Sequence, residues 1–393
     1  MAGEVRCIDS DDNLELWSYT NCTNESDEEI KKCRGQIRDR EDGHIVCASF
    51  GYTDEYICNN MDNVKPEEWR WFYSVEGTML RLFHFKEKWY LCTHRRLDAF
   101  KSRWSCRQTF GDIFIEYLHE IYGDETDVMT YLTSRLDKGR VYFFMLKSNY
   151  QNRIVCHYRT RRLLLIGSYD TSLEVFVFHT SSEDDDDMLS KIPGPQPFDE
   201  TDDLENKIMA MNIYEYQGII GFKKGRTIKV LHPDYKRLYD IRGNNPNLRF
   251  RYLEIRNEPD KVESLYTLYP RFSNIFDEYE NILLSISQMI HKFYVKRYIH
   301  KMYITLPPEE YSVMKKCHQW FLEDRSNHRV FTKKVFQMMN DEPALNLYKM
   351  IQRYQQQVQP VNRRPVYPSF PPRQETSLAQ IHFPPLDYER WIE

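Results

Sequence analysis

The 393-residue sequence has no long hydrophobic run. No stretch approaches the ~20 apolar residues that an α-helix needs to span a bilayer. The start of the chain, from Met1 to Asn13, is polar and acidic, unlike the apolar core of a secretory signal. We therefore predict an intracellular protein that has no membrane partner.

Closely spaced metal-ligand pairs are also missing. The nine cysteines lie far apart with no CxxC pair, and an odd number cannot pair completely, so we predict reduced thiols. The histidines are scattered without ligand spacing, which predicts no metal site. The chain has no glycine-rich phosphate loop and no nucleophile elbow, and Gly221–Arg226 is typical of a hairpin turn. These absences disfavour a metal-dependent enzyme with Cys and His ligands, a P-loop enzyme and a hydrolase with a nucleophile elbow.

Charge of one sign is not in excess, because 54 basic and 59 acidic side chains give a net charge of -5. A balanced total does not exclude nucleic acid, since only a local basic face is required. Aromatic residues make up 15% of the chain, with 28 Tyr and 22 Phe. Such a content is typical of rings that fill a core.

The order of sequence patterns predicts an α+β domain followed by a small all-helical domain. Short β-rich runs such as 44–50, 140–146, 153–158 and 162–169 are bounded by turn residues, and one clear helical pattern spans 110–122. After Pro259 the pattern is helical, with an apolar stripe from Ile282 to Tyr294 and a helix capped by Thr332. The predicted boundaries are an N-terminal extension 1–32, an antiparallel-sheet domain 33–258 and a helical domain 259–355.

Two segments have the composition of unstructured chain. Residues 181–206 combine an acidic run with several prolines, which predicts a surface loop. Residues 356–393 form a proline-rich tail that ends in an aromatic and acidic tip. The tip is either a partner-binding peptide or a frayed terminus.

Three stretches in order carry a resemblance: Cys33–Tyr52 with its Arg-Gly pair, Tyr73–Arg95, and Val141–Tyr169 with Asn-Arg-Ile-Val from Asn152. Together with Tyr216–Tyr235 they resemble the adenylation domain of the phage tRNA-repair RNA ligase, in the covalent nucleotidyltransferase superfamily. The Glu-Gly-Thr at 76–78, Thr93 and Ser-Arg-Trp at 102–104 look most like RNA-ligase-like proteins of large cytoplasmic DNA viruses. The resemblance implies a ligase-type (ATP-grasp-like) nucleotidyltransferase fold and a location in the host cytoplasm or virion.

In that family a lysine amine attacks the α-phosphate of ATP, and the AMP then passes to an RNA 5′-phosphate. Metal ions, carboxylates and lysines neutralise the charge that develops on phosphorus. The resemblance therefore implies ATP and Mg²⁺ as cofactors, if the chain is active, and tRNA or broken RNA ends as partners.

This sequence departs from the family pattern at the residues that carry the chemistry. The nucleophile position is Ser74, Glu76 replaces the motif aspartate, and the metal-binding glutamate is Gln217. The acid of the third stretch falls among residues 143–145, which are Phe, Phe and Met, and one of two lysines in the last strand is Leu231. In a second possible alignment the nucleophile is Arg95, which is permanently protonated and cannot attack. We therefore expect a catalytically degenerate protein.

Two alternatives stay open. Lys101 or Lys147 supplies a relocated amine and the chain is an active ATP-dependent RNA ligase, or the protein is a structural or virion protein that recruits partners through its acidic loop and tail. Radiolabelled ATP distinguishes the first alternative from a degenerate protein.

The family's binding residues survive better than its catalytic ones. By resemblance, nucleotide-binding candidates are Arg34, Gly77, Arg153, Gly218 and Lys229. Basic residues interleaved with rings suit single-stranded RNA, and they give the candidate RNA contacts Arg95, Arg96, Lys101, Arg103 and Trp104. The resemblance adds Lys292, Lys296 and Arg297 on a basic helix face, because a helical C-terminal domain contributes to tRNA specificity in the phage ligase. The alternatives are surface ion pairs for the arginines, a core position for Trp104 and a solvated helix side for the last three. Glu76 and Gln217 are interpreted as polar groups at strand ends.

Overall fold

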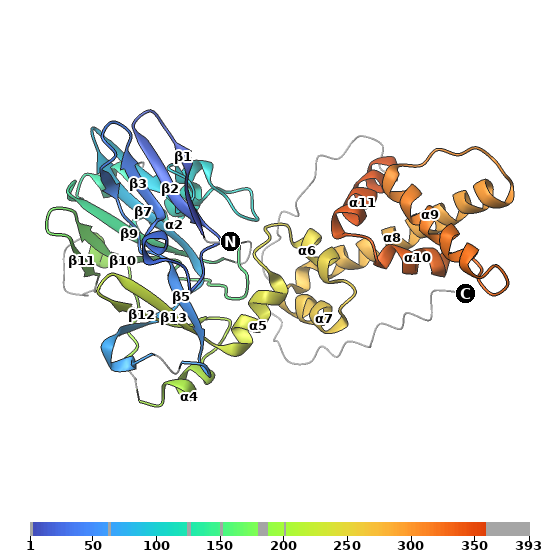
Figure 1. Ribbon diagram of the computed structural model, residues 1–393. Helices are drawn as coiled ribbons and strands as arrows, with labels where there is room; N and C mark the ends of the chain where they lie inside the picture. The colour runs from blue at the N-terminus through green and yellow to red at the C-terminus, as the bar shows by residue number, and fades with distance from the viewer. Residues whose placement is uncertain are drawn as a thin grey trace. The chain divides into compact units, whose positions relative to one another are not determined.

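The computed structural model describes residues 3–61, 64–123, 127–149, 152–179, 188–199 and 202–358. The chain divides into two compact units between Asn247 and Leu248, and each is described by itself (Figure 1). In the described residues no helix combines the length and the apolar character needed to cross a membrane.

The first unit contains three sheets. The first has the order β1 (Glu4–Ser10), β2 (Leu14–Thr20), β3 (Arg34–Asp39), β4 (Ile45–Cys47). The second has the order β11 (Val175–Phe178), β10 (Leu163–Asp170), β9 (Arg140–Lys147), β7 (Gly77–Phe85), β8 (Lys88–Cys92). The third has the order β5 (Thr53–Ile57), β13 (Arg226–Leu231), β12 (Gly218–Lys223), β6 (Arg70–Ser74). Among these strands only β13 and β5 pair in parallel, so the expected antiparallel α+β class is confirmed.

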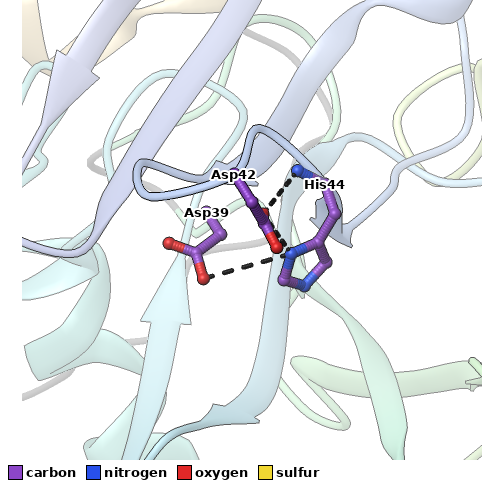
Figure 2. Close-up of side chains that lie close together, drawn as sticks. All are labelled: Asp39, Asp42 and His44. Atoms are coloured by element: carbon purple, nitrogen blue, oxygen red, sulfur yellow. Dashed lines mark hydrogen bonds and ion pairs between the residues drawn. The ribbon is translucent and has the colours of Figure 1, made fainter.

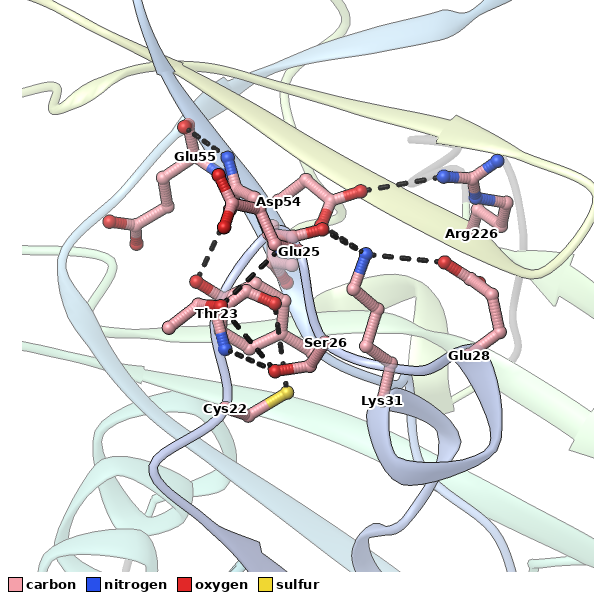
Figure 3. Close-up of polar contacts among 12 residues, drawn as sticks. Cys22, Thr23, Glu25, Ser26, Glu28, Lys31, Asp54, Glu55 and Arg226 are labelled. Carbon is pink, nitrogen blue, oxygen red and sulfur yellow. Dashed lines mark hydrogen bonds and ion pairs between the residues drawn. The ribbon is translucent and has the colours of Figure 1, made fainter. Parts of the chain in front are cut away.

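Residues 1–32 were predicted as an extension, but β1 and β2 belong to the first sheet. Between β2 and β3 lies the short helix α1 (Glu28–Lys32). Its buried Lys31 lies 3.0 Å from Asp54 of β5, which in turn lies 3.4 Å from Arg226 of β13 (Figure 3). These ion pairs connect the N-terminal segment to the third sheet, a long-range contact that no local pattern reveals.

The second sheet is buried on both faces. Successive side chains along its strands point to opposite faces, and apolar residues occupy both faces. Phe144 of β9 faces the helix α2 (Phe110–Tyr122), where its ring lies 5.1 Å from that of Phe114. Phe143 points the opposite way, toward the first sheet and the ring of Phe50 at 5.1 Å. Both positions are fully buried core, so hydrophobic packing has replaced the acid expected in this strand.

The helix predicted at 110–122 is confirmed with the same bounds. Thr109 and Asp112 form a reciprocal capping box at its start, and Gly123 ends it. Two further short helices complete the region around the sheets, α3 (Val128–Thr133) and α4 (Leu204–Met209). Helix α4 buries Leu204 and Ile208 against the third sheet.

Two further predictions in this unit were wrong. The run 153–158 is not a strand, because the backbone N–H groups of Ile154, Val155 and Cys156 bond to the Glu76 side chain instead of a neighbouring strand. Part of the stretch 181–206 is ordered: residues 188–191 form a 3₁₀ turn, and Ile192 and Phe198 are buried. The apolar residues that follow the acidic run are buried, so this part of the segment is ordered although the composition of the whole segment predicted a surface loop. The acidic run itself and the tail beyond residue 358 lie outside the described residues.

Helical structure begins before the predicted position. Helix α5 (Pro233–Arg242) still belongs to the first unit, and the second unit starts with α6 (Leu248–Ile255), ahead of Pro259. The difference arises because α6 packs against α7, α8 and α11. The other helices are α7 (Pro259–Leu268), α8 (Ser273–Tyr294), α9 (Pro308–Glu323), α10 (Thr332–Asn340) and α11 (Ala344–Val358).

The apolar stripe predicted on α8 is confirmed, since Ile282, Ile286, Ile290 and Tyr294 are buried. The predicted cap of α10 was wrong by one position. Phe331 occupies the N-cap without a side-chain hydrogen bond, and the Thr332 hydroxyl lies 3.4 Å from a His291 ring nitrogen.

Candidate functional site

The ends of β6, β12 and β13 bring together three side chains that the sequence had singled out. Ser74 pairs with Gly218 in the third sheet, which places Gln217 beside it. The Gln217 side-chain oxygen accepts hydrogen bonds from the Lys229 ammonium at 3.1 Å and from the Ser74 hydroxyl at 3.5 Å. A glutamine thus occupies the centre of what we call the Ser74 cluster, defined as Ser74, Gln217 and Lys229. Within the described residues, the Ser74 hydroxyl bonds to this neutral amide and to no basic side chain that would activate it.

Charged side chains of both signs lie beside this cluster. Burial lowers the pKa of Lys229, and of the nearby charges Glu55 raises it, Arg34 lowers it and Glu76 raises it. Burial also holds the pKa of His94 well below its usual range, with Arg34, Arg81 and Arg95 adding to the effect. Such an accumulation of cations attracts an anion. The structure therefore brings Arg95, predicted as an RNA contact, to the same region as Arg34, predicted as a nucleotide contact.

Arg34 and its neighbour are fixed by local contacts. The Arg34 guanidinium donates to the Gly51 carbonyl and the Thr53 hydroxyl, each at 3.3 Å. Gly35 has a φ of +69°, and a Cβ there would lie 2.8 Å from the His94 Cα. The Arg-Gly pair is thus explained by a close backbone approach between β3 and the turn that follows β8.

Gly77 and Gly218 are required by similar close approaches. A Cβ at Gly77 would lie 2.1 Å from the Leu146 carbonyl oxygen across the β7–β9 ladder. At Gly218 a Cβ would lie 2.1 Å from the Val230 carbonyl oxygen, and its φ of +139° disfavours other residues. Gly77 therefore allows β7 and β9 to approach closely, and Gly218 does the same for β12 and β13.

Glu76 has a role that sequence reasoning missed. Its buried carboxylate accepts backbone N–H bonds from Ile154 at 2.5 Å, Val155 at 2.8 Å and Cys156 at 3.0 Å. The Tyr235 hydroxyl donates a further bond at 3.2 Å. Glu76 therefore replaces a strand partner for the segment 153–158. Because Glu76 lies 78 residues before Ile154, no local sequence signal indicated this contact.

Arg153 lies in the same segment. It is buried, and its guanidinium donates to the Val155 carbonyl at 3.1 Å. Its positive charge contributes to lowering the pKa of His157, after burial as the main cause. The Arg153 side chain thus stabilises the same segment that hydrogen-bonds to Glu76.

Lys147 ends β9 directly opposite Gly77. Burial, with help from Arg161, lowers the pKa of its amine to about 8. The ammonium lies 4.1 Å from the centre of the Tyr158 ring, and the Tyr158 hydroxyl lies 3.2 Å from the Glu76 backbone nitrogen. Of the two lysines considered as relocated amines, Lys147 adjoins the segment held by Glu76. Lys101 is exposed and lies 3.4 Å from Asp98.

The other basic residues after β8 are held in different ways. Arg95, Arg96 and Arg103 are exposed, and Arg96 lies 3.4 Å from Asp9. Trp104 packs against the α2 core, and the Arg242 guanidinium lies 5.3 Å from its ring centre. These contacts favour the core alternative for Trp104.

In the second unit, Lys292 lies in the last turn of α8, while Lys296 and Arg297 lie in a π-helical turn, Val295–Ile299. Lys292 and Lys296 are exposed. The Arg297 guanidinium lies 3.4 Å from the Tyr311 hydroxyl. The sequence correctly placed this basic segment on a helix up to Tyr294.

One group of possible metal ligands occurs in the described residues, at the turn between β3 and β4: Asp39, Asp42 and His44 (Figure 2). The Asp42 carboxylate accepts from the His44 backbone N–H at 3.0 Å and lies 2.6 Å from the ring nitrogen. These bonds lower the pKa of Asp42. The contacts stabilise the turn, and two of the three side chains are exposed.

The residues near the Ser74 cluster suit a phosphate better than a Mg²⁺ ion. Magnesium prefers carboxylate oxygens, but the Glu76 oxygens already accept amide hydrogen bonds and Gln217 is neutral. Another carboxylate nearby belongs to Glu55, which lies opposite Lys229 in the register of β5 and β13. Arg34, Lys229 and Arg95 instead supply the donors that bind phosphate.

No protein-family model matches the chain. It is 25% identical over 293 residues to the immediate-early protein ICP-46 homolog of Invertebrate iridescent virus 3, a match that covers 71% of this chain and 63% of the relative. The corresponding protein of Invertebrate iridescent virus 6 is 24% identical over 308 residues, with 72% and 66% covered. The chain thus spans slightly less than two thirds of these relatives, which are viral proteins.

Two solved structures overlap in part. A protein of Aquifex aeolicus assigned as an ATP-dependent DNA ligase gives a TM-score of 0.34 at 11% identity, with 89% of this chain and 73% of that chain covered. An archaeal ATP-dependent RNA ligase gives a TM-score of 0.38 at 8% identity, with 87% and 92% covered.

Proposed function

We propose that this chain is a ligase-like protein that binds a phosphate-bearing ligand, ATP or a 5′-phosphorylated RNA end, at the Ser74 cluster without forming a covalent AMP adduct there. The observation that carries the proposal is that Lys229 and the serine at the expected nucleophile position donate to the same Gln217 amide oxygen, with the Arg34 charge acting on the same lysine. A serine hydroxyl without a neighbouring base is a poor nucleophile.

The cluster also explains how the chain can bind a phosphate without forming the AMP adduct. Gln217 hydrogen-bonds Lys229 in place of a carboxylate, so the ammonium is not neutralised by an ion pair at this position. Bringing a phosphate to partly buried cations replaces lost hydration with charge-assisted hydrogen bonds. Each such bond contributes about 1.5–3 kcal/mol, which corresponds to roughly ten- to a hundredfold in affinity.

The experiment is a calorimetric titration of the full chain with ATP, with a 5′-phosphorylated RNA and with the same RNA bearing a 5′-hydroxyl. We expect Lys229→Met to lower the affinity for the phosphate-bearing ligands by about tenfold or more. The matched control is Lys224→Met, in the exposed turn between β12 and β13. Equal binding by wild type and Lys229→Met, or equal binding of both RNA ends, contradicts the proposal.

A second candidate is an active ligase that uses Lys147, and the lowered pKa of this amine favours it. The neutral amine would attack the α-phosphorus of ATP, forming a P–N bond as the bond to pyrophosphate breaks, and the amine proton would go to solvent. An AMP adduct that is lost in Lys147→Arg would support this candidate over the first. The hypothesis of a structural or virion protein stays a prediction, because its acidic run and tail lie outside the described residues.

A further inference from the structure

The end of α8 and the loop that follows it form an exposed basic and aromatic surface in the second unit. From Asn281 to Pro308 the sequence contains no Asp or Glu, whereas it contains four Lys and Arg residues. Tyr303 is 90% exposed, and Ile299 and Met302 are 63% and 54% exposed. We call this the Tyr303 surface, defined as Lys292, Lys296, Arg297, Ile299, Lys301, Met302 and Tyr303.

Backbone structure fixes the exposure of Tyr303. The helix widens at its end, where the His300 N–H donates to the Val295 carbonyl at 3.0 Å in a π-type bond. Lys301 then has a φ of +56°, which reverses the direction of the chain. The following loop alternates, with Ile304 and Leu306 half-buried and Tyr303 and Thr305 exposed. Two apolar anchors on the opposite side therefore hold the Tyr303 ring toward solvent.

The positive charge of this surface is not neutralised by carboxylates. Among the described residues of the second unit, no ion pair joins Lys292, Lys296, Arg297 or Lys301 to an acid. The nearest acids in sequence, Glu309 and Glu310, lie within 2.9 Å and 2.6 Å of Arg353.

Aromatic rings next to the cations are already arranged in stacks. The His318 ring stacks on Tyr298 with centres 3.6 Å apart, and Arg297 lies 5.3 Å from the Tyr311 ring centre. Burial lowers the pKa of His318, and the charges of Lys301 and Arg325 lower it further.

We propose that the Tyr303 surface binds single-stranded nucleic acid, with Lys292, Lys296 and Lys301 contacting phosphates and Tyr303 stacking on a base. Unpaired bases stack on exposed rings, and their backbone follows basic residues, without any need for a deep pocket. A protein partner would more often require a desolvated apolar centre with few charges. The proposal rests on the proposed function for its RNA context, but it concerns a separate surface.

The test measures binding of an RNA 12-mer and a DNA 12-mer, each with a 5′-hydroxyl and a 3′ dye, by fluorescence anisotropy of the full chain. The 5′-hydroxyl removes the terminal phosphate that the Ser74 cluster is proposed to bind. We expect Tyr303→Ala to weaken binding about fivefold or more, as loss of one stacked base does. Replacing Lys292 and Lys296 by Gln should make the slope of log K against log salt shallower by about 1.4.

Lys138→Gln, an exposed lysine in the first unit, is the matched control and should leave both quantities unchanged. Absence of oligonucleotide binding by the wild type overturns the proposal and leaves this surface to a protein partner. The proposal also fails if Tyr303→Ala changes the oligomeric state while the oligonucleotide affinity stays the same. Because ATP titration is scored separately, either failure is distinguishable from failure of the phosphate site.

Discussion

Removing the Glu76 carboxylate tests the interpretation that this acid organises the segment 153–158. In Glu76→Ala the backbone N–H groups of Ile154, Val155 and Cys156 lose their acceptor in a largely buried place. The Tyr235 hydroxyl loses an acceptor as well. Burial and the Glu76 charge together hold the pKa of Tyr235 well above its usual range, so this hydroxyl stays protonated and able to donate.

The size of the effect follows from these bonds. A hydrogen bond to a charged group contributes about 1.5–3 kcal/mol, and an orphaned buried donor costs about 1–3 kcal/mol. The four losses are not additive, because water can enter the space that the side chain leaves. We expect Glu76→Ala to lower the free energy of unfolding by about 3–5 kcal/mol, near the upper end for single substitutions. Glu76→Gln keeps one acceptor oxygen, so about half of that loss is expected.

Urea unfolding measures the global loss, and hydrogen exchange of the amides at 154–156 measures the local one. The matched control is Glu87→Gln, an exposed glutamate in the turn between β7 and β8. Its free energy of unfolding should differ from wild type by no more than about 0.5 kcal/mol, as is usual for surface substitutions. If Glu76→Ala unfolds at the wild-type urea concentration and these amides keep their protection, Glu76 does not hold the segment.

Three further predictions concern other parts of the first unit. A Cβ at Gly218 would lie 2.1 Å from a carbonyl oxygen. Gly218→Ala should therefore lower the urea midpoint markedly, by about 3 kcal/mol of stability; an unchanged midpoint would contradict the close approach. Lys147 is protonated below its pKa of about 8, so mass spectrometry should show its acylation rate rising to half its maximum near that pH; a rate still climbing two pH units higher would refute the lowered pKa. Asp54→Asn removes one of the two carboxylates beside the buried Lys31 ammonium, at 3.0 Å, while Glu28 remains at 3.2 Å. It should destabilise the chain by about 2 kcal/mol, the size of one hydrogen bond between charged groups, and calorimetric melting at the wild-type temperature would count against this.

Sequence periodicity predicted the elements that depend on local patterns. The α2 helix was predicted with correct bounds from its apolar residues at helical spacing, and the structure adds a capping box at its start and a glycine at its end. The β7–β8 hairpin and the strands β9, β12 and β13 were predicted because β-rich runs are bounded there by turn residues. Local consistency of this kind is what a single sequence carries most reliably.

Elements that depend on distant contacts could not be predicted in this way. The run 153–158 has the composition of a strand, but Glu76, distant in sequence, takes its N–H groups. Residues 1–32 gave no sign that they would extend the first sheet. Glu55 reaches Lys229 only because β5 pairs in parallel with β13. Motif positions did bring Ser74, Gln217 and Lys229 to attention, and the structure places these three in contact.

Intact-protein mass spectrometry after incubation with ATP and Mg²⁺ tests the central claim most directly. With a serine at the expected nucleophile position, hydrogen-bonded to a neutral amide, we expect the mass to stay unchanged while ATP still binds in the calorimeter. A mass increase of one AMP per chain would contradict the account. Its location on Lys147 would make the protein an active nucleotidyltransferase with a relocated lysine.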